Sequence, residues 1–397
     1  MNKKNPLLLT APPLAPPAFR SRAAIALAAI AAEGRFALQV CTACATVQYP
    51  ARDACQACLS TTLAWRDVPS GGQILARTII RASADPYFRL RLPWPIATIA
   101  LDCGPSVIAH LHGDATDRVR MTLRLDKSGQ AVMLAMPAED TPTMQDDPIL
   151  REMTCDPSDR RVLITDGRSA IGQAMAAALT QAGAATVFAG IADPWKPYKK
   201  LVGEVPLDLT DETSVRTFAA EFGARVDIVI NTALHLRPGN ILDRRDTITA
   251  HEDMEAAYFG PLRLAQSLGP ALRARTADGA RPACAWVNLL SVYALAPAPG
   301  FSALAAAQAA GLSLAQALRT ELCPLRVINA LIGPPDDAWH AALPPPKLAP
   351  TALANAIVRA LRDGIEDLAI GDIAQDVLAR WKNNPMMLAR ELGEKTP

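Results

Sequence analysis

Apolar residues in the second half of the chain follow two periods in turn. Residues 161–165 form a short apolar run, which is typical of a buried strand. Apolar positions then recur at helical spacing through residues 171–182, and Gly183 follows as the expected C-cap. The pattern predicts a strand, a turn and a helix in that order.

The C-terminal part repeats this alternation. We expect an amphipathic helix at 350–361, an extended return at 364–371 and a second helix at 376–392. The second helix carries Met386 and Met387, which give it a soft apolar face. Such a face suits either a partner surface or packing within the chain.

Segments of the first half alternate or run apolar between Gly, Pro and Asp residues. They are expected as strands at 74–80, 96–101, 107–111 and 118–125. Short strands at this spacing predict a small barrel. Before them, residues 23–32 predict an Ala-rich helix.

Four cysteines near the N-terminus have metal-ligand spacing. Cys41 and Cys44 form one Cys-x-x-Cys knuckle, and Cys55 and Cys58 form a second one ten residues later. Four thiolates can surround one ion tetrahedrally, and such sites favour zinc. A closed set leaves no open position for substrate, so we expect a structural zinc. A rubredoxin-like iron centre is the main alternative.

The residues around the knuckles resemble a known family. The segments Glu33–Cys41, Tyr49–Arg52 and Gly71–Leu75 are similar to the zinc-ribbon plus OB-fold family that accompanies thiolases and acyl-CoA-handling enzymes. The match covers roughly residues 22 to 137. It implies an accessory subunit that binds acyl-CoA or packs on a thiolase-like or aldolase-like partner, without a general catalytic residue of its own.

Composition argues against the nucleic-acid binding that an OB barrel also permits. Lys+Arg of 40 against Asp+Glu of 39 gives a formal net charge of +1, and aromatic residues are only 5%. The chain therefore has neither an electrostatic funnel nor many stacking platforms. Four arginines do cluster in sequence, as a solvated rim or as contacts for CoA phosphates: Arg77, Arg81, Arg89 and Arg91.

Residues 159 to 390 resemble the short-chain dehydrogenase/reductase family. The strand Trp286–Ser291 and the helix after it are similar to the family's Val-Asn-x-Ser-Ser strand and Tyr-x-x-x-Lys helix. Asp208 resembles the family's adenine-contacting Asp, and Asn231 resembles the Asn-Asn-Ala-Gly strand end. The resemblance implies an α/β doubly wound Rossmann domain with a parallel sheet.

The catalytic positions of that family are changed here. Ser291 is retained, whereas Leu304 and Gln308 stand where the family has Tyr and Lys, and Ala257 replaces an Asn. The phenol donates or accepts the substrate proton, and the lysine one turn away lowers its pKa. Leucine has no such proton, and an uncharged amide cannot tune a neighbour by Coulomb interaction. We therefore expect a catalytically silent domain.

Tyr293 offers another interpretation. It follows Ser291 by two residues and could serve as an acid in a residual dehydrogenase. No lysine follows it at helical spacing, so nothing in the sequence would lower its pKa.

The phosphate-binding turn is altered as well. Residues 165–172 resemble the family's Thr-Gly-x-x-x-Gly-x-Gly, with Asp166 and Ala170 in place of the first two glycines. A carboxylate at this position opposes a pyrophosphate but can cap the helix instead. Dinucleotide binding is therefore doubtful, and if it occurs, the resemblance assigns it to Thr165, Gly167, Gly172, Asp208 and Asn231.

A chain of 397 residues, 50% of them hydrophobic, can bury two cores. We expect a disordered Pro-rich segment at 1–21, a helix and zinc ribbon at 22–66, an OB-fold barrel at 67–137, a linker at 138–158, and the Rossmann domain with its helical tail at 159–397. No run reaches the roughly 18 apolar residues that would span a bilayer. The remaining cysteines show no disulfide pattern, which fits a reducing cytoplasm.

Together these features predict a non-catalytic accessory subunit of an acyl-CoA-processing complex. Its expected partner in a hetero-oligomer is a thiolase-, aldolase- or dehydrogenase-like enzyme, with no membrane or nucleic-acid partner. The competing hypothesis is an NAD(P)-dependent reductase that acts on an acyl-CoA or a ketone through unorthodox residues.

Overall fold

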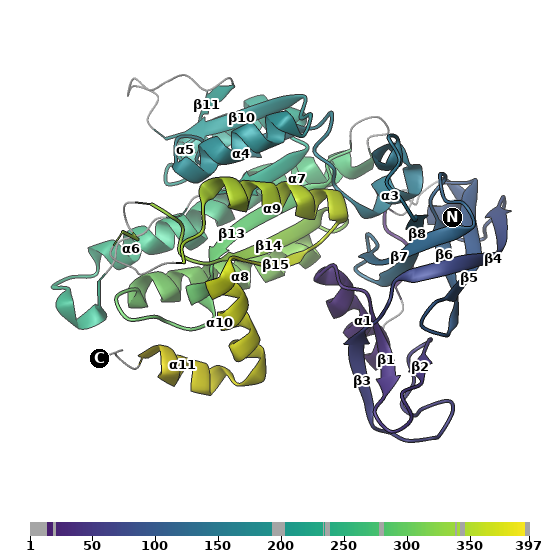
Figure 1. Ribbon diagram of the computed structural model, residues 1–397. Helices are drawn as coiled ribbons and strands as arrows, with labels where there is room; N and C mark the ends of the chain where they lie inside the picture. Colours follow the sequence, from purple (N-terminus) through teal and green to yellow (C-terminus); the bar gives the residue numbers. More distant parts are fainter. Residues whose placement is uncertain are drawn as a thin grey trace, which may run out of the picture. The chain divides into compact units, whose positions relative to one another are not determined.

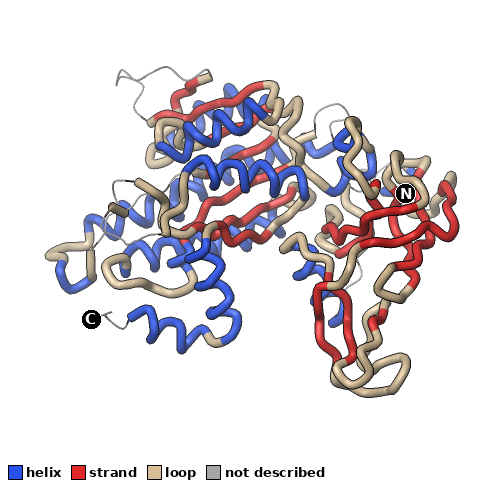
Figure 2. The backbone as a smooth tube through the Cα atoms, in the orientation of Figure 1, coloured by secondary structure: helices blue, strands red, loops and turns tan. Residues whose placement is uncertain are grey.

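The computed structural model describes residues 14–18, 21–192, 203–232, 234, 239–277, 282–337, 340–341 and 346–393. The chain divides into two compact units, residues 1–154 and 155–397. Each unit is described by itself below, with its elements labelled in Figure 1 and coloured by type in Figure 2.

The first unit begins with a helix and a small sheet. Helix α1 (Arg22–Ala32) starts after Ser21, whose hydroxyl oxygen accepts a hydrogen bond from the Ala24 N–H at 3.1 Å. A three-stranded antiparallel sheet follows in the order β2-β1-β3, with bounds Ala37–Cys41 for β1, Val47–Gln48 for β2 and Leu63–Asp67 for β3. The predicted N-terminal helix is confirmed.

Five strands then close into the predicted barrel, in the order β4-β5-β6-β8-β7. Their bounds are β4 Gly71–Ile80, β5 Trp94–Leu101, β6 Ser106–Leu111, β7 Arg118–Leu125 and β8 Ala131–Pro137, with the short helix α2 (Pro86–Arg89) between β4 and β5. Along β6, buried residues alternate with more exposed ones, as expected for strands whose inner face fills a barrel.

One core joins the helix, the small sheet and the barrel. Leu27 of α1, Leu38 of β1, Ile99 of β5 and Leu123 of β7 all belong to a single buried cluster. The ribbon therefore cannot loosen without exposing apolar surface of the barrel as well.

The segment expected as a linker is partly folded. Residues 144–146 form a 3₁₀ turn, and Pro148–Met153 form helix α3, whose Leu150 and Met153 are buried against Trp94 of the barrel. Asp147 caps α3 by accepting a hydrogen bond from the Leu150 N–H at 2.8 Å, and Pro148 occupies the first turn. A proline such as Pro148 fits a linker, but proline also favours the first turn of a helix.

The second unit is built on the expected parallel sheet. Seven strands lie in the order β11-β10-β9-β12-β13-β14-β15, with bounds β9 Arg161–Ile164, β10 Thr186–Ile191, β11 Glu204–Pro206, β12 Ile228–Asn231, β13 Ala285–Ser291, β14 Arg326–Ile332 and β15 Asp367–Ile370. The strand order reverses between β9 and β12. In doubly wound sheets, ligands bind at the carboxyl ends of the strands at this point.

Helices cover both faces of the sheet. Alternate residues of each central strand face opposite ways, so Val162 and Ile164 of β9 pack in one core and Leu163 packs in the other. The first core is covered by α4 (Ala170–Gln181) and α9 (Pro350–Asp363). The second is covered by α5 (Glu212–Phe222), α7 (Gly260–Ala274) and α8 (Ser302–Glu321).

The C-terminal prediction was partly correct. Helix α9 and strand β15 confirm the expected helix and extended return. The expected last helix is instead two helices, α10 (Asp372–Asn383) and α11 (Pro385–Gly393), because Pro385 cannot continue α10. No helix among the residues just described combines the length and apolar character needed to cross a bilayer.

Candidate functional site

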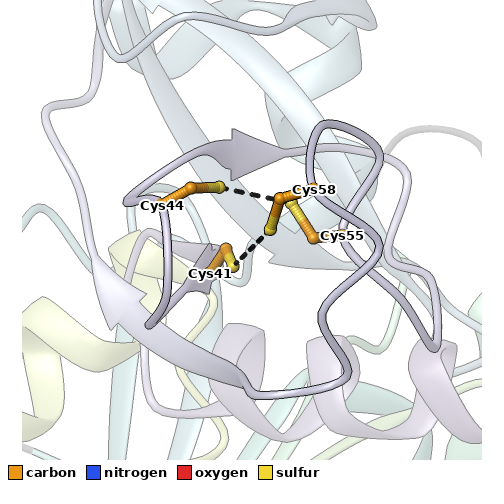
Figure 3. A group of neighbouring side chains, drawn as sticks. All are labelled: Cys41, Cys44, Cys55 and Cys58. Atoms are coloured by element: carbon orange, nitrogen blue, oxygen red, sulfur yellow. Dashed lines mark hydrogen bonds between the residues drawn. The ribbon is translucent and has the colours of Figure 1, made fainter.

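The two cysteine knuckles have matching backbones. The residue after each knuckle, Ala45 or Leu59, has a φ of 61°, and its N–H donates to the carbonyl of the first cysteine, Cys41 or Cys55, at 2.9 and 3.0 Å. A left-handed conformation is costly for residues other than glycine, so the surrounding fold must hold it in place. The repeated turn aims both cysteines of each knuckle at a common centre (Figure 3).

The sulfur geometry fits a metal ion. All four Sγ atoms lie within 4.8 Å of one another, and the pairs Cys41–Cys58 and Cys44–Cys55 are each 3.6 Å apart. Four thiolates around zinc at about 2.3 Å would be separated by about 3.8 Å, close to these distances. The chemistry of the donors, four sulfurs with no open position, fits a structural zinc.

Two buried glutamines brace the second knuckle, a role that the sequence did not reveal. Gln48 donates from Nε2 to Gln39 Oε1 at 3.0 Å, and its Oε1 accepts the Gln56 N–H at 3.0 Å. Gln39 Oε1 also accepts the Arg52 N–H at 2.8 Å. The hydrogen bond between Gln39 and Gln48 depends on the pairing of β1 with β2, and no local sequence motif predicts it.

The residues at the dehydrogenase positions do come together. Ser291 ends β13, and its N–H donates to Gln308 Oε1 of α8 at 2.8 Å. Ala257 lies on a π-helical turn, Glu255–Phe259, against α8: a methyl added to Gly311 would lie 2.6 Å from the Ala257 carbonyl oxygen. The scaffold around the catalytic positions therefore persists, with an amide bound to backbone where the family has an ammonium.

Leu304 fills its position with hydrocarbon. It is 1% exposed and belongs to a cluster with Tyr293 and Phe301. The same cluster includes Ala374, Val377 and Leu388 of the two C-terminal helices. Helix α10 also contacts the short helical turn at residues 292–294 that follows β13. These tail residues pack within their own unit, whereas Met386 and Met387 are 72% and 45% exposed, so the expected apolar face of the last helix stays uncovered among the described residues.

Tyr293 is poorly suited to proton transfer. Its ring stacks on Phe301 at 5.2 Å between centroids, and Phe301 stacks on His340 at 5.9 Å. Burial raises the pKa of the Tyr293 phenol, whereas a catalytic acid–base near neutral pH needs a lowered one.

The phosphate-binding turn caps itself. Ser169 is the N-cap of α4, and its Oγ accepts the Gly172 N–H at 3.0 Å, while Asp166 Oδ1 accepts the Ser169 N–H at 3.3 Å. Burial raises the pKa of the Asp166 carboxyl. The Ser169 and Gly172 N–H groups are therefore already bonded within the turn, and the exposed methyl of Ala170 lies at the helix start. These residues do not fit a dinucleotide pyrophosphate well.

The two glycines of the turn are explained by its own packing. A Cβ on Gly167 would lie 2.5 Å from Ala189 Cβ, and one on Gly172 would lie 1.9 Å from the Asp166 carbonyl oxygen. Glycine is needed at both positions whether or not a ligand binds. Their presence is therefore no evidence for a nucleotide.

The other two candidate cofactor contacts are bonded within the chain. Thr165 Oγ1 donates to Asn231 Oδ1 at 3.1 Å, which joins the ends of β9 and β12 at the strand reversal. Asp208 Oδ1 accepts from the N–H and hydroxyl of Thr210 at 2.9 and 2.7 Å. The sequence also offers Asp193, two residues after the end of β10, for a ribose contact, but this residue lies outside the described residues.

The arginine run on the barrel is largely bound within its own unit. Arg91 Nε donates to Glu152 at 3.0 Å and its guanidinium lies 3.8 Å from the centre of the Tyr87 ring. Arg89 donates to two backbone carbonyls, and Arg77 pairs with Asp117 at 3.5 Å. These contacts favour the solvated rim over a CoA phosphate site.

Comparison with protein families identifies three parts of the chain. Residues 28–64 match the family described as ChsH2, rubredoxin-like zinc ribbon domain, and residues 65–130 match ChsH2, C-terminal OB-fold domain. Residues 160–336 match the short chain dehydrogenase family. The chain is a fusion of ChsH2-type zinc ribbon and OB-fold domains with a short-chain dehydrogenase domain. Its four-cysteine cluster is accordingly the site of a structural zinc.

Two solved structures of short-chain dehydrogenases are similar to part of this chain. A short chain dehydrogenase from Burkholderia cenocepacia, solved in complex with NADP, is 28% identical with a TM-score of 0.53 and covers 60% of this chain and 99% of that one. A short-chain dehydrogenase from Streptomyces avermitilis is 25% identical with a TM-score of 0.49, covering 59% and 96%.

A curated relative is more distant. The 3-ketodihydrosphingosine reductase of Dictyostelium discoideum is 27% identical over 134 residues, which are 32% of this chain and 39% of the relative. The chain thus spans about two fifths of the length of that relative.

The altered turn leads to a prediction for Asp166→Gly. Removing the carboxylate restores the first glycine of the family turn and frees the Ser169 N–H, so we expect NADPH to bind at least tenfold more tightly, or about 1.4 kcal/mol. Titration followed by nicotinamide fluorescence measures this. Asp166→Asn is the matched control, because it removes charge but keeps the side chain. Equal affinity for all three proteins would show that Asp166 does not oppose the nucleotide.

Proposed function

We propose that this chain is a non-catalytic accessory subunit of an acyl-CoA-processing complex. In this proposal the zinc ribbon and OB barrel engage a thiolase-, aldolase- or dehydrogenase-like enzyme in a hetero-oligomer. The dehydrogenase domain belongs to a family of NAD(P)-dependent oxidoreductases but transfers no hydride itself.

The observation that carries the proposal is the environment of Leu304 and Gln308. Hydride transfer to a ketone leaves an alkoxide that needs a proton, and neither side chain can supply one. Leu304 is 1% exposed within an apolar cluster, and the Gln308 amide is hydrogen-bonded to the backbone of Ser291. Both replacing side chains are held by contacts within the fold. These contacts favour a structural role for the two residues over a catalytic site from which a single group is missing.

The N-terminal domains support the accessory role. Their resemblance to proteins that accompany acyl-CoA enzymes gives the expected substrate class of the complex. The barrel interior is filled by its own apolar side chains, including Ile99, Val107 and Leu123, so a partner or acyl-CoA would have to meet its outer surface.

The test measures hydride transfer by the zinc-loaded full chain. Purified protein is mixed with NADH or NADPH and a panel of 3-ketoacyl-CoA thioesters and simple ketones, and absorbance at the nicotinamide band is followed. We expect no turnover by the chain alone. We also expect co-purification from the native host to recover an acyl-CoA-handling enzyme whose rate depends on this chain.

Tyr293→Phe is the matched control for the competing reductase hypothesis. The substitution removes only the hydroxyl of a stacked ring, so the fold should be retained. Turnover by the isolated chain that disappears in this variant would establish an unorthodox reductase and overturn the accessory proposal.

A further inference from the structure

Two cysteines that are far apart in the sequence meet in the second unit. Cys155 Sγ donates to the Cys284 carbonyl oxygen at 3.3 Å, just before β13 begins. Both backbones are fixed: the Cys155 N–H donates to Leu361 O at 2.8 Å, and the Cys284 N–H donates to Asp227 O at 2.9 Å. Cys155 is 2% exposed, whereas Cys284 is only partly buried.

The surroundings of this pair favour a thiolate. The Cys284 carbonyl also accepts the Arg326 N–H at 2.9 Å, and the buried guanidinium of Arg326 lies near enough to act on the Cys155 thiol through its positive charge. Arg160 contributes a second positive charge nearby. The interaction with the Cys284 side chain, aided by the two arginines, lowers the pKa of the Cys155 thiol, while the same interaction raises the pKa of the Cys284 thiol.

We propose that Cys155 and Cys284 form an oxidisable dithiol site whose co-substrate is a small hydroperoxide. One member presents a thiolate stabilised by arginine, and the other is a neighbouring thiol that can resolve the first oxidation product. Hydrogen peroxide is little larger than water, so it can approach through the partly exposed side at Cys284.

The chemistry balances within the pair and the peroxide. The Cys155 sulfur attacks one peroxide oxygen, the O–O bond breaks, and a sulfenic acid forms while hydroxide leaves and is protonated to water. The Cys284 sulfur then attacks the sulfenic sulfur: an S–S bond forms, the S–O bond breaks, and the thiol proton leaves with the hydroxide as a second water. Two thiols are oxidised to a disulfide as one peroxide is reduced to two waters.

The disulfide would covalently link the start of the second unit to the residue that precedes β13. Because Cys155 and Cys284 are far apart in the sequence, a disulfide between them closes a long loop. Such a disulfide restricts the unfolded chain more than one that closes a short loop. The oxidised protein should therefore unfold at a higher temperature than the reduced one, and dithiothreitol should reverse the shift.

The experiment treats the zinc-loaded full chain with hydrogen peroxide and maps cysteines by mass spectrometry after alkylation without reductant. Zinc release is followed in parallel with a chromogenic chelator, so that oxidation of the ribbon is distinguished. We expect a peptide cross-link between Cys155 and Cys284 to form at lower peroxide than zinc release. Cys284→Ser should abolish the cross-link and leave a dimedone-reactive sulfenic acid on Cys155.

Cys323→Ser is the matched control, because Cys323 is partly buried in the same unit and should not affect the cross-link. The proposal is overturned if both thiols remain alkylatable at peroxide concentrations that already release zinc. It is equally overturned if Cys284→Ser leaves Cys155 unoxidised under conditions that cross-link the unsubstituted chain, since Cys155 would then not be the attacking thiolate.

Discussion

Loss of the zinc ligand in Cys55→Ser should unfold the ribbon and loosen the barrel next to it. Structural zinc contributes about 10–16 kcal/mol of apparent binding free energy in small zinc domains. The contacts of a three-stranded sheet alone cannot replace a stabilisation of this size. The left-handed turns at Ala45 and Leu59 would lose the ion that holds them. We expect zinc content to fall to background and amide protection to disappear from β1 to β3.

The effect should extend into the barrel because the core is shared. Leu38 of the ribbon and Ile99 and Leu123 of the barrel belong to one buried cluster. Hydrogen exchange across residues 71–137 should therefore also accelerate, whereas the sheet of the second unit should keep its protection. Chelation of the unsubstituted protein should reproduce the pattern.

Cys103→Ser is the control, since Cys103 lies in the same unit but outside the metal cluster. It should retain one zinc per chain and normal exchange. Persistent protection of β1 after complete zinc removal would contradict a structural role for the ion.

The parts that the sequence predicted correctly depend on local or periodic information. The knuckle spacing sets the four thiols in two turns, and alternation along segments such as Ser106–Leu111 determines which side chains fill the barrel. The parallel sheet followed from several spaced motifs that agree. These features need no knowledge of which distant residues meet.

Apart from the split at Pro385, the errors and omissions involve distant contacts. Helix α3 is stabilised by its contact with Trp94, which is more than fifty residues away in the sequence. The local sequence shows only the prolines around the helix, and these favour a linker. The split of the last helix at Pro385 could have been predicted from proline alone. The Gln39–Gln48 bond and the Cys155–Cys284 contact depend on strand pairing and tertiary packing, which no local motif encodes.

The changed dehydrogenase positions are an intermediate case. The sequence identified the replacements, whereas the structure shows what the replacing side chains contact. Gln308 holds the end of β13 through the Ser291 N–H, and Leu304 packs in a cluster shared with the C-terminal helices. In this chain, the side chains at these two positions stabilise the fold.

Asp227→Ala should cause a large loss of stability in the second unit. The Asp227 side chain is 0% exposed and accepts hydrogen bonds from the Arg161 N–H and guanidinium at 2.8 to 3.0 Å, and from Arg275. Removing the acid takes a buried carboxylate away from two largely buried guanidinium groups. Breaking such a buried pair costs about 3–5 kcal/mol. Urea unfolding followed by circular dichroism measures the change.

Asp376→Ala is the matched control in the same unit. Asp376 pairs with Arg380 at 3.1 Å, but its side chain is 61% exposed. Exposed pairs of this kind contribute about 0–1 kcal/mol. If Asp227→Ala lowered the free energy of unfolding no more than Asp376→Ala does, the buried network would contribute no more to stability than a surface pair.

The effect of Asp227→Ala should depend on pH in a defined direction. Burial opposes ionisation of Asp227, but the hydrogen bonds from Arg161 and Arg275 outweigh it and hold its pKa below the ordinary value. A lowered folded-state pKa contributes stability that is fully present above the unfolded pKa of about 3.9 and is lost as pH falls through the folded value. The difference between Asp227→Ala and the unsubstituted protein should therefore stay constant from pH 7 to about pH 5 and shrink below about pH 4. A difference that instead grew on acidification would mean that the carboxylate destabilises the fold, because its desolvation would then exceed its pairing with the two arginines.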